Sequence, residues 1–324
     1  MLKFQDRYPL KNLTTLQIGG PAKKFVIISS EKELIEAIKF AKQQNLPFLI
    51  IGGGSNLLVS DEGFEGLIIK NEITGISTFQ ESPSTSLGTR KPTWKVSVKS
   101  GTVLQDLVNF ADEKGLSGLQ DLAGIPGTLG GAVFGNAGAY GQTISDHLVS
   151  VKTLNINNLA IEQFSNNTCQ FEYRSSIFKK NHYVILEATF LLKKNGVESL
   201  KEESSNILTK RAVKYPPGIK CPGSFFKNLV VADLPKEVLS KIPPEKIVYG
   251  KVPAGSLLEE AGARGASLGG IEIADYHANL FINKGEGTAK DFYNLAKKYA
   301  LKVKEKFVVT LEPEVQLINL PPLN

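Results

Sequence analysis

The chain has 324 residues and a formal net charge of +6, and 42% of its residues are hydrophobic. This length allows two or three compact domains, each with its own core. Basic and acidic residues are interspersed without a long basic run, which argues against a surface that tracks nucleic-acid phosphates.

The chain has two cysteines, Cys169 and Cys221, and three histidines. Their spacing fits neither a metal site nor a disulfide framework, so we expect no bound metal. No apolar segment approaches the length of a membrane span, and the first residues lack the apolar core of a signal peptide. These features are typical of a cytoplasmic protein.

Residues 1–72 alternate between predicted strands and a predicted helix. Strands are predicted at residues 24–28 and 47–51. Between them, Ser30 and Glu33 have the spacing of a capping box, and an apolar stripe follows at helical intervals. This alternation indicates a small α/β unit.

Residues 73–214 mix both kinds of element, which indicates an α+β segment. The predicted strands cover residues 94–99, 149–156, 170–173 and 183–192. The predicted helices cover residues 103–111 and 199–214, and the Ser/Thr/Pro-rich residues 82–92 are predicted to be a surface loop.

A Pro-Pro-Gly sequence at residues 216–218 interrupts the chain, so we place a domain boundary beside it and assign residues 215–324 to a further domain. Helices are predicted near residues 256–261 and at 288–304, and a strand is predicted at 307–318.

Three loops dense in glycine lie at residues 14–22, 50–58 and 124–141. The longest has seven glycines in eighteen residues, no charge and several apolar side chains. Ordered glycine costs backbone entropy, and a flexible linker would carry more serine and charge. A main chain with its amides turned toward an anion explains the pattern better. The loop is therefore predicted to line a large cofactor, although the Rossmann and P-loop fingerprints are absent.

Three polar side chains stand in apolar sequence surroundings. Arg174 lies among aromatic residues, where its guanidinium either binds a carboxylate or phosphate or forms a structural ion pair. Ser224 follows a Pro-Gly turn, and context alone favours a hydrogen-bonding role over a nucleophile. Glu314 would share a strand face with Glu312 and Gln316, which fits either a solvent-facing row or a carboxylate directed into a cleft.

Together these segments resemble the UDP-N-acetylenolpyruvoylglucosamine reductase family. The six motifs that carry the resemblance are residues 15–20, 52–58, 125–141, 173–179, 223–228 and 311–315. The short interval from Arg174 to Ser224 resembles the shorter, type II branch, with which we place the chain, whereas residues 214–216 and 223–226 resemble the longer branch.

The resemblance implies an α+β fold with three parts. Residues 1–72 and 73–214 would form the two subdomains of an FAD-binding fold of the vanillyl-alcohol oxidase type, and residues 215–324 a C-terminal α+β substrate-binding domain. FAD would be bound non-covalently between the two subdomains. The residues assigned to FAD are Ile51, Gly52, Gly53, Gly54, Ser55, Asn56, Leu57, Ile125, Pro126, Gly127, Gly130, Gly131, Asn136, Gly138, Ala139, Tyr140 and Gly141.

The resemblance also implies the reaction. NADPH would reduce FAD, and the hydride would then pass to the enolpyruvyl group of UDP-N-acetylglucosamine enolpyruvate, giving UDP-N-acetylmuramate for peptidoglycan synthesis. Arg174 would clamp the substrate carboxylate, Glu314 would help to polarise it, and Ser224 would protonate C2.

Ser224 would need a proton source, for which Lys227 or a water is expected. The candidate substrate contacts are Tyr173, Lys214, Lys227, Asn228 and His277, with a structural role as the alternative for His277. The expected partners are the nucleotide substrate and NADPH, with no membrane or nucleic acid, and the expected state is a monomer.

Two alternative functions remain open from the sequence. One is another FAD-dependent oxidoreductase on the same fold, such as an alcohol or lactone oxidase. The other is a nucleotide-sugar-binding module that has lost its flavin.

Overall fold

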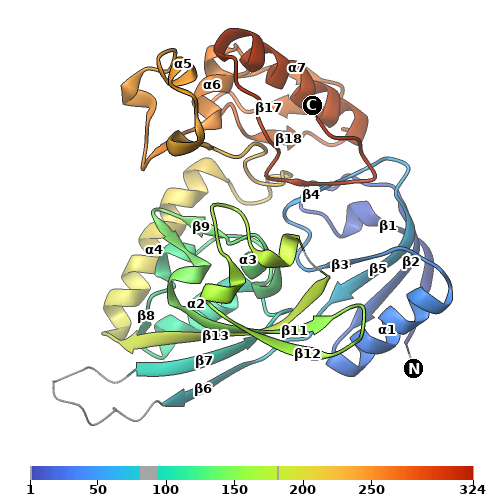
Figure 1. Cartoon of the computed structure of the whole chain (residues 1–324). Coiled ribbons are helices and arrows are strands. Elements are labelled where there is room, and N and C mark those ends of the chain that lie inside the picture. Colours follow the sequence, from blue (N-terminus) through green and yellow to red (C-terminus); the bar gives the residue numbers. More distant parts are fainter. Residues whose placement is uncertain (1, 81–92, 181, 324) are drawn as a thin grey trace. The chain divides into compact units, whose positions relative to one another are not determined.

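The computed structural model describes residues 2–80, 93–180 and 182–323 (Figure 1). By their packing these residues form two compact units. The first unit contains the segment ending at Gln5 together with Lys24–Gly53 and Gly66–Val213, and the second contains Asp6–Lys23, Gly54–Glu65 and Lys214–Asn324. Both units contain helices and strands, which confirms the α+β class. The second unit includes two segments from the N-terminal part of the chain. The predicted domain boundaries at residues 72 and 214 remain predictions.

The first unit contains a parallel strand pair, β3 (Phe48–Ile51) with β5 (Phe64–Asn71), and β5 also neighbours β2 (Pro21–Ile28). Helix α1 (Glu31–Gln43) has a buried face of Leu34, Ala37, Ile38 and Ala41 that packs against these strands. The Ser30 hydroxyl accepts a hydrogen bond from the Glu33 amide at 3.2 Å, so the helix begins where the capping pattern predicts.

The larger sheet of the first unit has the strand order β12-β11-β13-β7-β6, and β8 pairs with β13. These strands are β6 (Ile76–Gln80), β7 (Thr93–Lys99), β8 (Leu116–Ser117), β11 (Leu148–Asn155), β12 (Ile161–Ser165) and β13 (Tyr183–Lys194). All the pairings within it are antiparallel. The loop predicted at residues 82–92 lies outside the described residues.

Three helices cover one face of this sheet (Figure 1): α2 (Leu104–Glu113), α3 (Leu129–Phe134) and α4 (Val197–Lys214). Leu107, Val133 and Ile207 from these helices belong to one buried cluster with Val96 of β7. Near α3 lies the short hairpin of β9 (Gly138–Ala139) and β10 (Gln142–Thr143). The 3-10 helices of this unit are Gln120–Leu122, Ile144–His147, Asn167–Cys169 and Ile177–Lys179.

The second unit contains several small sheets. They are β14 (Leu229–Val230) with β15 (Lys251–Val252), then β16 (Ser267–Leu268), β17 (Ile271–Ile273) and β18 (Phe281–Asn283), and the parallel pair β4 (Leu57–Val59) with β19 (Gln316–Ile318). Strand β1 (Gln5–Pro9) begins at the last residue of the first unit's opening segment. The remaining elements are α5 (Lys236–Leu239), α6 (Ala254–Glu260), α7 (Ala289–Phe307) and the 3-10 helices Leu10–Asn12, Val231–Asp233 and Pro244–Lys246.

Helix α7 has the strongest start signal of the second unit. The Thr288 hydroxyl accepts from the Asp291 amide at 3.0 Å, and the Asp291 carboxylate accepts in return from the Thr288 amide at 3.2 Å. The Asp61 carboxylate also accepts from the amides of Ala289 and Lys290. Since helix N-termini expose such amides, an acidic side chain from residues 54–65 completes this helix.

The core of the second unit is built around a cluster of phenylalanine rings. The ring centroid of Phe292 on α7 lies 5.0 Å from that of Phe225 and 5.1 Å from that of Phe281. All three rings are fully buried. Their packing holds the main chain around residue 225 against the long helix.

Two predicted strands are wrong. At residues 170–173, Gln170 has a φ of 48° and only an isolated bridge joins Glu172 to Ser175, so this stretch is a turn. At residues 307–318, α7 continues through Phe307 because that ring is the last buried position of its apolar stripe. The strand is confined to Gln316–Ile318. Within the described ranges, no helix is both long enough and apolar enough to span a bilayer.

Replacing Phe292 with alanine should remove the centre of the phenylalanine cluster. We expect a loss of ~3–5 kcal/mol in the free energy of unfolding, as for other buried aromatic residues, measured by chemical denaturation followed by circular dichroism. Leu301 lies on the same helix and is 46% exposed, so Leu301→Ala serves as the control and should cost well under half as much. Equal effects of the two changes would contradict this view of the core.

Candidate functional site

In the first unit, two glycine loops meet at Gly53 and Gly127. A Cβ atom on Gly53 would lie 2.8 Å from the Cα of Gly127, and one on Gly52 would lie 2.1 Å from Oγ1 of Thr128. Real Cβ atoms do not approach other atoms so closely, so Gly53 packs on the main chain of Gly127 and Gly52 packs on the side chain of Thr128. The ammonium group of Lys70, whose pKa is lowered by burial, donates a hydrogen bond to the Gly52 carbonyl.

The segment 124–141 contains strained main chain and unsatisfied acceptors. Asn136 and Tyr140 have φ values of 43° and 52°, in the left-handed region that side chains avoid. Oδ1 of Asn136 and Oε1 of the neighbouring Gln142 are buried and have no hydrogen-bond partner among the described residues. Because leaving a buried acceptor unpaired is costly, these atoms point to a ligand that carries N–H or O–H donors.

Arg174 lies against the same segment and is itself strained, with a φ of 54°. Its Nη2 donates to the Gly138 carbonyl at 2.8 Å, and its guanidinium stacks on the Tyr173 ring with its carbon 5.1 Å from the centroid. Lys179 donates from Nζ to the Arg174 carbonyl at 2.9 Å. These contacts fix the guanidinium beside the glycine segment, where it is suited to bind an anionic group.

In the second unit, Ser224 has two polar side chains beside its hydroxyl. Oη of Tyr215 lies 3.1 Å from Oγ of Ser224, and Nε2 of His277 lies 3.5 Å from it. Burial, together with the charges of Lys214 and Arg264, lowers the pKa of His277 to about 3. The imidazole is therefore neutral at pH 7, and Ser224 faces two uncharged partners.

The main chain around Ser224 is held rigidly by Asn279. The Asn279 side chain accepts from the Phe226 amide and donates to the Phe226 carbonyl, both at 2.8 Å. The Phe225 amide donates to the Asn279 carbonyl at 3.0 Å, and the Phe225 carbonyl accepts from the Glu314 amide at 2.7 Å. Glu314 is therefore attached to the residue that follows Ser224.

The two carboxylates near the chain end differ in environment. Glu312 is exposed, and one of its oxygens lies 3.0 Å from Nζ of Lys227. Glu314 is half-buried, and its carbonyl accepts from the side-chain amide of Asn56 at 3.1 Å. Glu312 is thus the solvent-facing acid. The expected proton source for Ser224, Lys227 or a water, stays a prediction: Lys227 is paired with Glu312, and the described side chains beside the Ser224 hydroxyl are Tyr215 and His277.

The candidate residues divide between the two units. The first unit holds Ile51, Gly52, Gly53, the assigned positions from Ile125 to Gly141, Tyr173 and Arg174. The second holds Gly54, Ser55, Asn56, Leu57, Lys214, Ser224, Lys227, Asn228, His277 and Glu314. Asn228 has a structural contact, since its Oδ1 accepts from the Ala254 amide at 3.2 Å.

Sequence reasoning missed two residues of these surroundings, Lys70 and Tyr215. Lys70 had one available signal, because it is a single lysine at the end of the otherwise apolar run 67–69. Tyr215 had none, since nine residues separate it from Ser224 and only the folded chain brings the two hydroxyls together.

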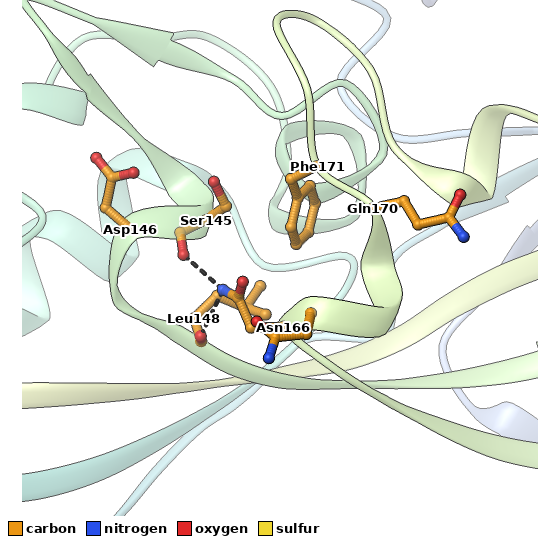
Figure 2. Close-up of a pocket in the computed structure, with 7 residues that line it drawn as sticks. Ser145, Asp146, Leu148, Asn166, Gln170 and Phe171 are labelled. Atoms are coloured by element: carbon orange, nitrogen blue, oxygen red, sulfur yellow. Dashed lines mark hydrogen bonds between the residues drawn. The ribbon is translucent and has the colours of Figure 1, made fainter.

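A separate depression of about 600 Å³ in the first unit is lined by Ser145, Asp146, Leu148, Asn166, Asn167, Gln170 and Phe171. Figure 2 shows most of these side chains. Polar side chains of this depression form hydrogen bonds to the main chain of the same unit. Asn166 donates from its side chain to the carbonyls of Ser145 and Leu148, at 2.7 and 2.8 Å. The Asp146 carboxylate accepts from the Thr143 amide at 2.8 Å. We assign no ligand to it.

Across the residues that the structure describes, no group of three or more His, Cys, Asp or Glu side chains is arranged to hold a metal ion. Both cysteines are buried thiols, and burial raises the pKa of Cys169 to about 12. That thiol is therefore protonated and unreactive at neutral pH.

Comparison with known proteins gives matches along almost the whole chain. A family model described as "FAD binding domain" matches residues 22–158, and one described as "UDP-N-acetylenolpyruvoylglucosamine reductase, C-terminal domain" matches residues 215–318. A UDP-N-acetylenolpyruvoylglucosamine reductase of Solibacter usitatus is 40% identical over 312 residues, covering 96% of this chain and 95% of that protein. The enzyme of the same name from Caldanaerobacter subterraneus is 34% identical and covers 96% of this chain and 92% of its own length.

The solved structures give a match of similar extent. The crystal structure of UDP-N-acetylenolpyruvylglucosamine reductase from Thermus caldophilus is 28% identical, with a TM-score of 0.70, and the match covers 98% of this chain and 99% of that one.

The low pKa of His277 gives stability a defined pH dependence. In the unfolded chain the imidazole takes up a proton near pH 6.5, whereas in the folded protein it does so only at about 3. Protons therefore favour the unfolded state between these values, and stability falls as pH drops through this window. We expect His277→Gln to lose less stability than the parent between pH 7 and pH 4.5 in parallel urea titrations. Identical pH dependence of the two proteins would contradict the burial of a neutral imidazole.

Proposed function

The chain belongs to the UDP-N-acetylenolpyruvoylglucosamine reductase family, and on that basis we propose that it uses NADPH and FAD to reduce UDP-N-acetylglucosamine enolpyruvate to UDP-N-acetylmuramate. The observation that carries this proposal is the 40% identity to a reductase of that name over 96% of the chain. Full-length similarity of this kind disfavours both an oxidase of other substrates and a flavin-less binding module. The reaction serves peptidoglycan synthesis, and so cell shape and division. We also propose that the protein works as a monomer in the cytoplasm.

The glycine loops fit the FAD that the family model implies. Gly53 and Gly127 allow the main chain of both loops to lie where side chains would otherwise stand. The buried acceptors on Asn136 and Gln142 suit the hydroxyl and imide donors of a flavin nucleotide. We propose that residues 51–57 and the assigned positions within 125–141 hold FAD. When bound, FAD supplies the hydride transfer, and the protein supplies position and charge.

The reaction places negative charge on the substrate, and the proposed catalytic residues stabilise that charge. Reduction at C3 leaves an enolate at C2 that is delocalised into the carboxylate. The Arg174 guanidinium offers a planar pair of donors to this carboxylate, which orients it and stabilises the charge. Glu314 helps to polarise the same group. Ser224 then delivers its hydroxyl proton to C2.

The proposed substrate contacts differ in what already surrounds them. Nζ of Lys214 lies 5.2 Å from the centre of the Tyr215 ring, whose hydroxyl contacts Ser224. We propose that Lys214, His277 and Tyr173 contact the nucleotide sugar. Lys227 and Asn228 already bind Glu312 and the Ala254 amide, so we propose that they position the loop that follows Ser224.

An anaerobic titration tests the function and the role of Ser224. In the parent protein, NADPH should bleach the flavin absorbance and the enolpyruvyl nucleotide should restore it. Ser224→Ala should keep the bleaching but slow the recovery by ~10²–10⁴, the usual contribution of a positioned general acid. A parent protein whose bleached flavin ignores the nucleotide would sink the proposed function. Fast recovery in Ser224→Ala would instead overturn only the role of the serine.

A second test concerns the contact between the glycine loops. Gly53→Ala should push the two main chains apart and weaken FAD retention by about tenfold or more, as measured by flavin fluorescence on dilution. Gly196 belongs to the same unit and has no atom within 4 Å of an added Cβ, so Gly196→Ala is the matched control and should retain FAD as the parent does. Unchanged retention in Gly53→Ala would show that the close contact does not shape the cofactor site.

A further inference from the structure

The hydroxyl of Ser224 needs a second proton donor if it is to act as an acid. An aliphatic hydroxyl ionises far above neutral pH, so a serine that gives a proton to carbon must regain one as it does so. Two side chains, Tyr215 and His277, lie within hydrogen-bonding distance of its oxygen. Among the described residues, these two are the side chains placed to orient the hydroxyl or to replenish its proton.

His277 is suited to orientation but not to proton supply. Its imidazole is half-buried, and this burial together with the charges of Lys214 and Arg264 lowers its pKa. The neutral ring holds its remaining N–H proton far more tightly than a phenol does. Its separation from Ser224, 3.5 Å, is also at the long limit of a hydrogen bond. His277 therefore has no proton to release at pH 7.

Tyr215 has both the shorter contact and the more acidic proton. Its Oη lies 3.1 Å from Oγ of Ser224, and a phenol, with an ordinary pKa near 10, gives its proton to an alkoxide spontaneously. The ring is packed against Cys221, Ala274 and Leu280, which fixes its position. The ammonium of Lys214 lies 5.2 Å from the ring centre, where its charge would stabilise a phenolate.

We propose that Tyr215 is a positioning and proton-relay residue for Ser224; this inference rests on the proposed function. As the electron pair of the substrate enolate takes the Ser224 proton at C2, the O–H bond of Ser224 breaks. The Tyr215 O–H bond breaks at the same time, and its proton passes to Oγ of Ser224. The phenolate that remains on Tyr215 is held by Lys214 and takes a proton from solvent before the next turnover. The relay moves protons only, because the hydride comes from NADPH.

Tyr215→Phe tests the relay because it removes one oxygen and keeps the packed ring. NADPH should bleach the flavin at the parent rate, and calorimetry should give the parent affinity for the nucleotide substrate. Recovery of the flavin colour by substrate should slow by ~10–100-fold, a part of the effect of a full general acid. In mixtures of H₂O and D₂O, the parent rate should depend on deuterium content as for two protons in motion, and that of Tyr215→Phe as for one.

Three further variants separate relay from mere support. Tyr215→Gln places an amide donor near Ser224 without a transferable proton, so it should remain slow, and recovery to the parent rate would overturn the relay. In a Ser224→Ala background, Tyr215→Phe should cause no further loss. Tyr276, the 48% exposed neighbour of His277, provides the control Tyr276→Phe, which should behave as the parent does.

These experiments distinguish failure of the Tyr215 relay from failure of the proposed reductase function. A parent protein that reduces the nucleotide, together with a Tyr215→Phe variant of equal speed and an unchanged deuterium profile, overturns the relay alone. A parent protein that does not turn over the nucleotide at all overturns the proposed function, whatever Tyr215 does.

Discussion

In the first unit the main chain at Gly53 packs directly on the main chain at Gly127, and the proposed cofactor site depends on this contact. Gly53 follows β3 and Gly127 precedes α3, and a methyl group on Gly53 would collide with the Cα of Gly127. The strain at Asn136 and Tyr140 and the unsatisfied acceptors nearby belong to the same segment. Backbone strain and unpaired buried acceptors both destabilise the folded protein. Their presence in this segment is consistent with a main-chain surface that binds the proposed cofactor.

The second unit positions its chemistry by a different means. There a cluster of buried aromatic rings fixes Phe225, and the Asn279 side chain bonds both main-chain groups of Phe226. The main chain around Ser224 is therefore held in one conformation. The Glu314 amide donates a hydrogen bond to the Phe225 carbonyl of the same segment. The proposed reacting groups, Ser224 and Glu314, are half-buried. The buried aromatic side of the segment supplies its rigidity.

Much of this was predictable from local patterns. The start of α1 followed from Ser30 and the stripe of α7 from its spacing, because both depend on residues that are near in sequence. The failures have physical causes. Phe307 belongs to the end of a helix because its ring is buried against the core, which no local propensity reports. Glu312 and Glu314 look equivalent in sequence, and only the folded chain shows that Glu312 is exposed beside Lys227 whereas Glu314 is half-buried. Likewise, the pairing of Tyr215 with Ser224 depends on the folded chain.

The composition of the second unit also bears on how the protein is made. Residues 6–23 and 54–65 pack with the C-terminal third, and β4 pairs in parallel with β19, which lies among the last residues of the chain. During translation these early segments emerge from the ribosome long before their partners are synthesised. They must wait with apolar residues such as Leu16 and Leu58 uncovered. Such late closure is slow and exposes the nascent chain to aggregation, so chaperone binding at these two segments would shield it until β19 is available to pair with β4.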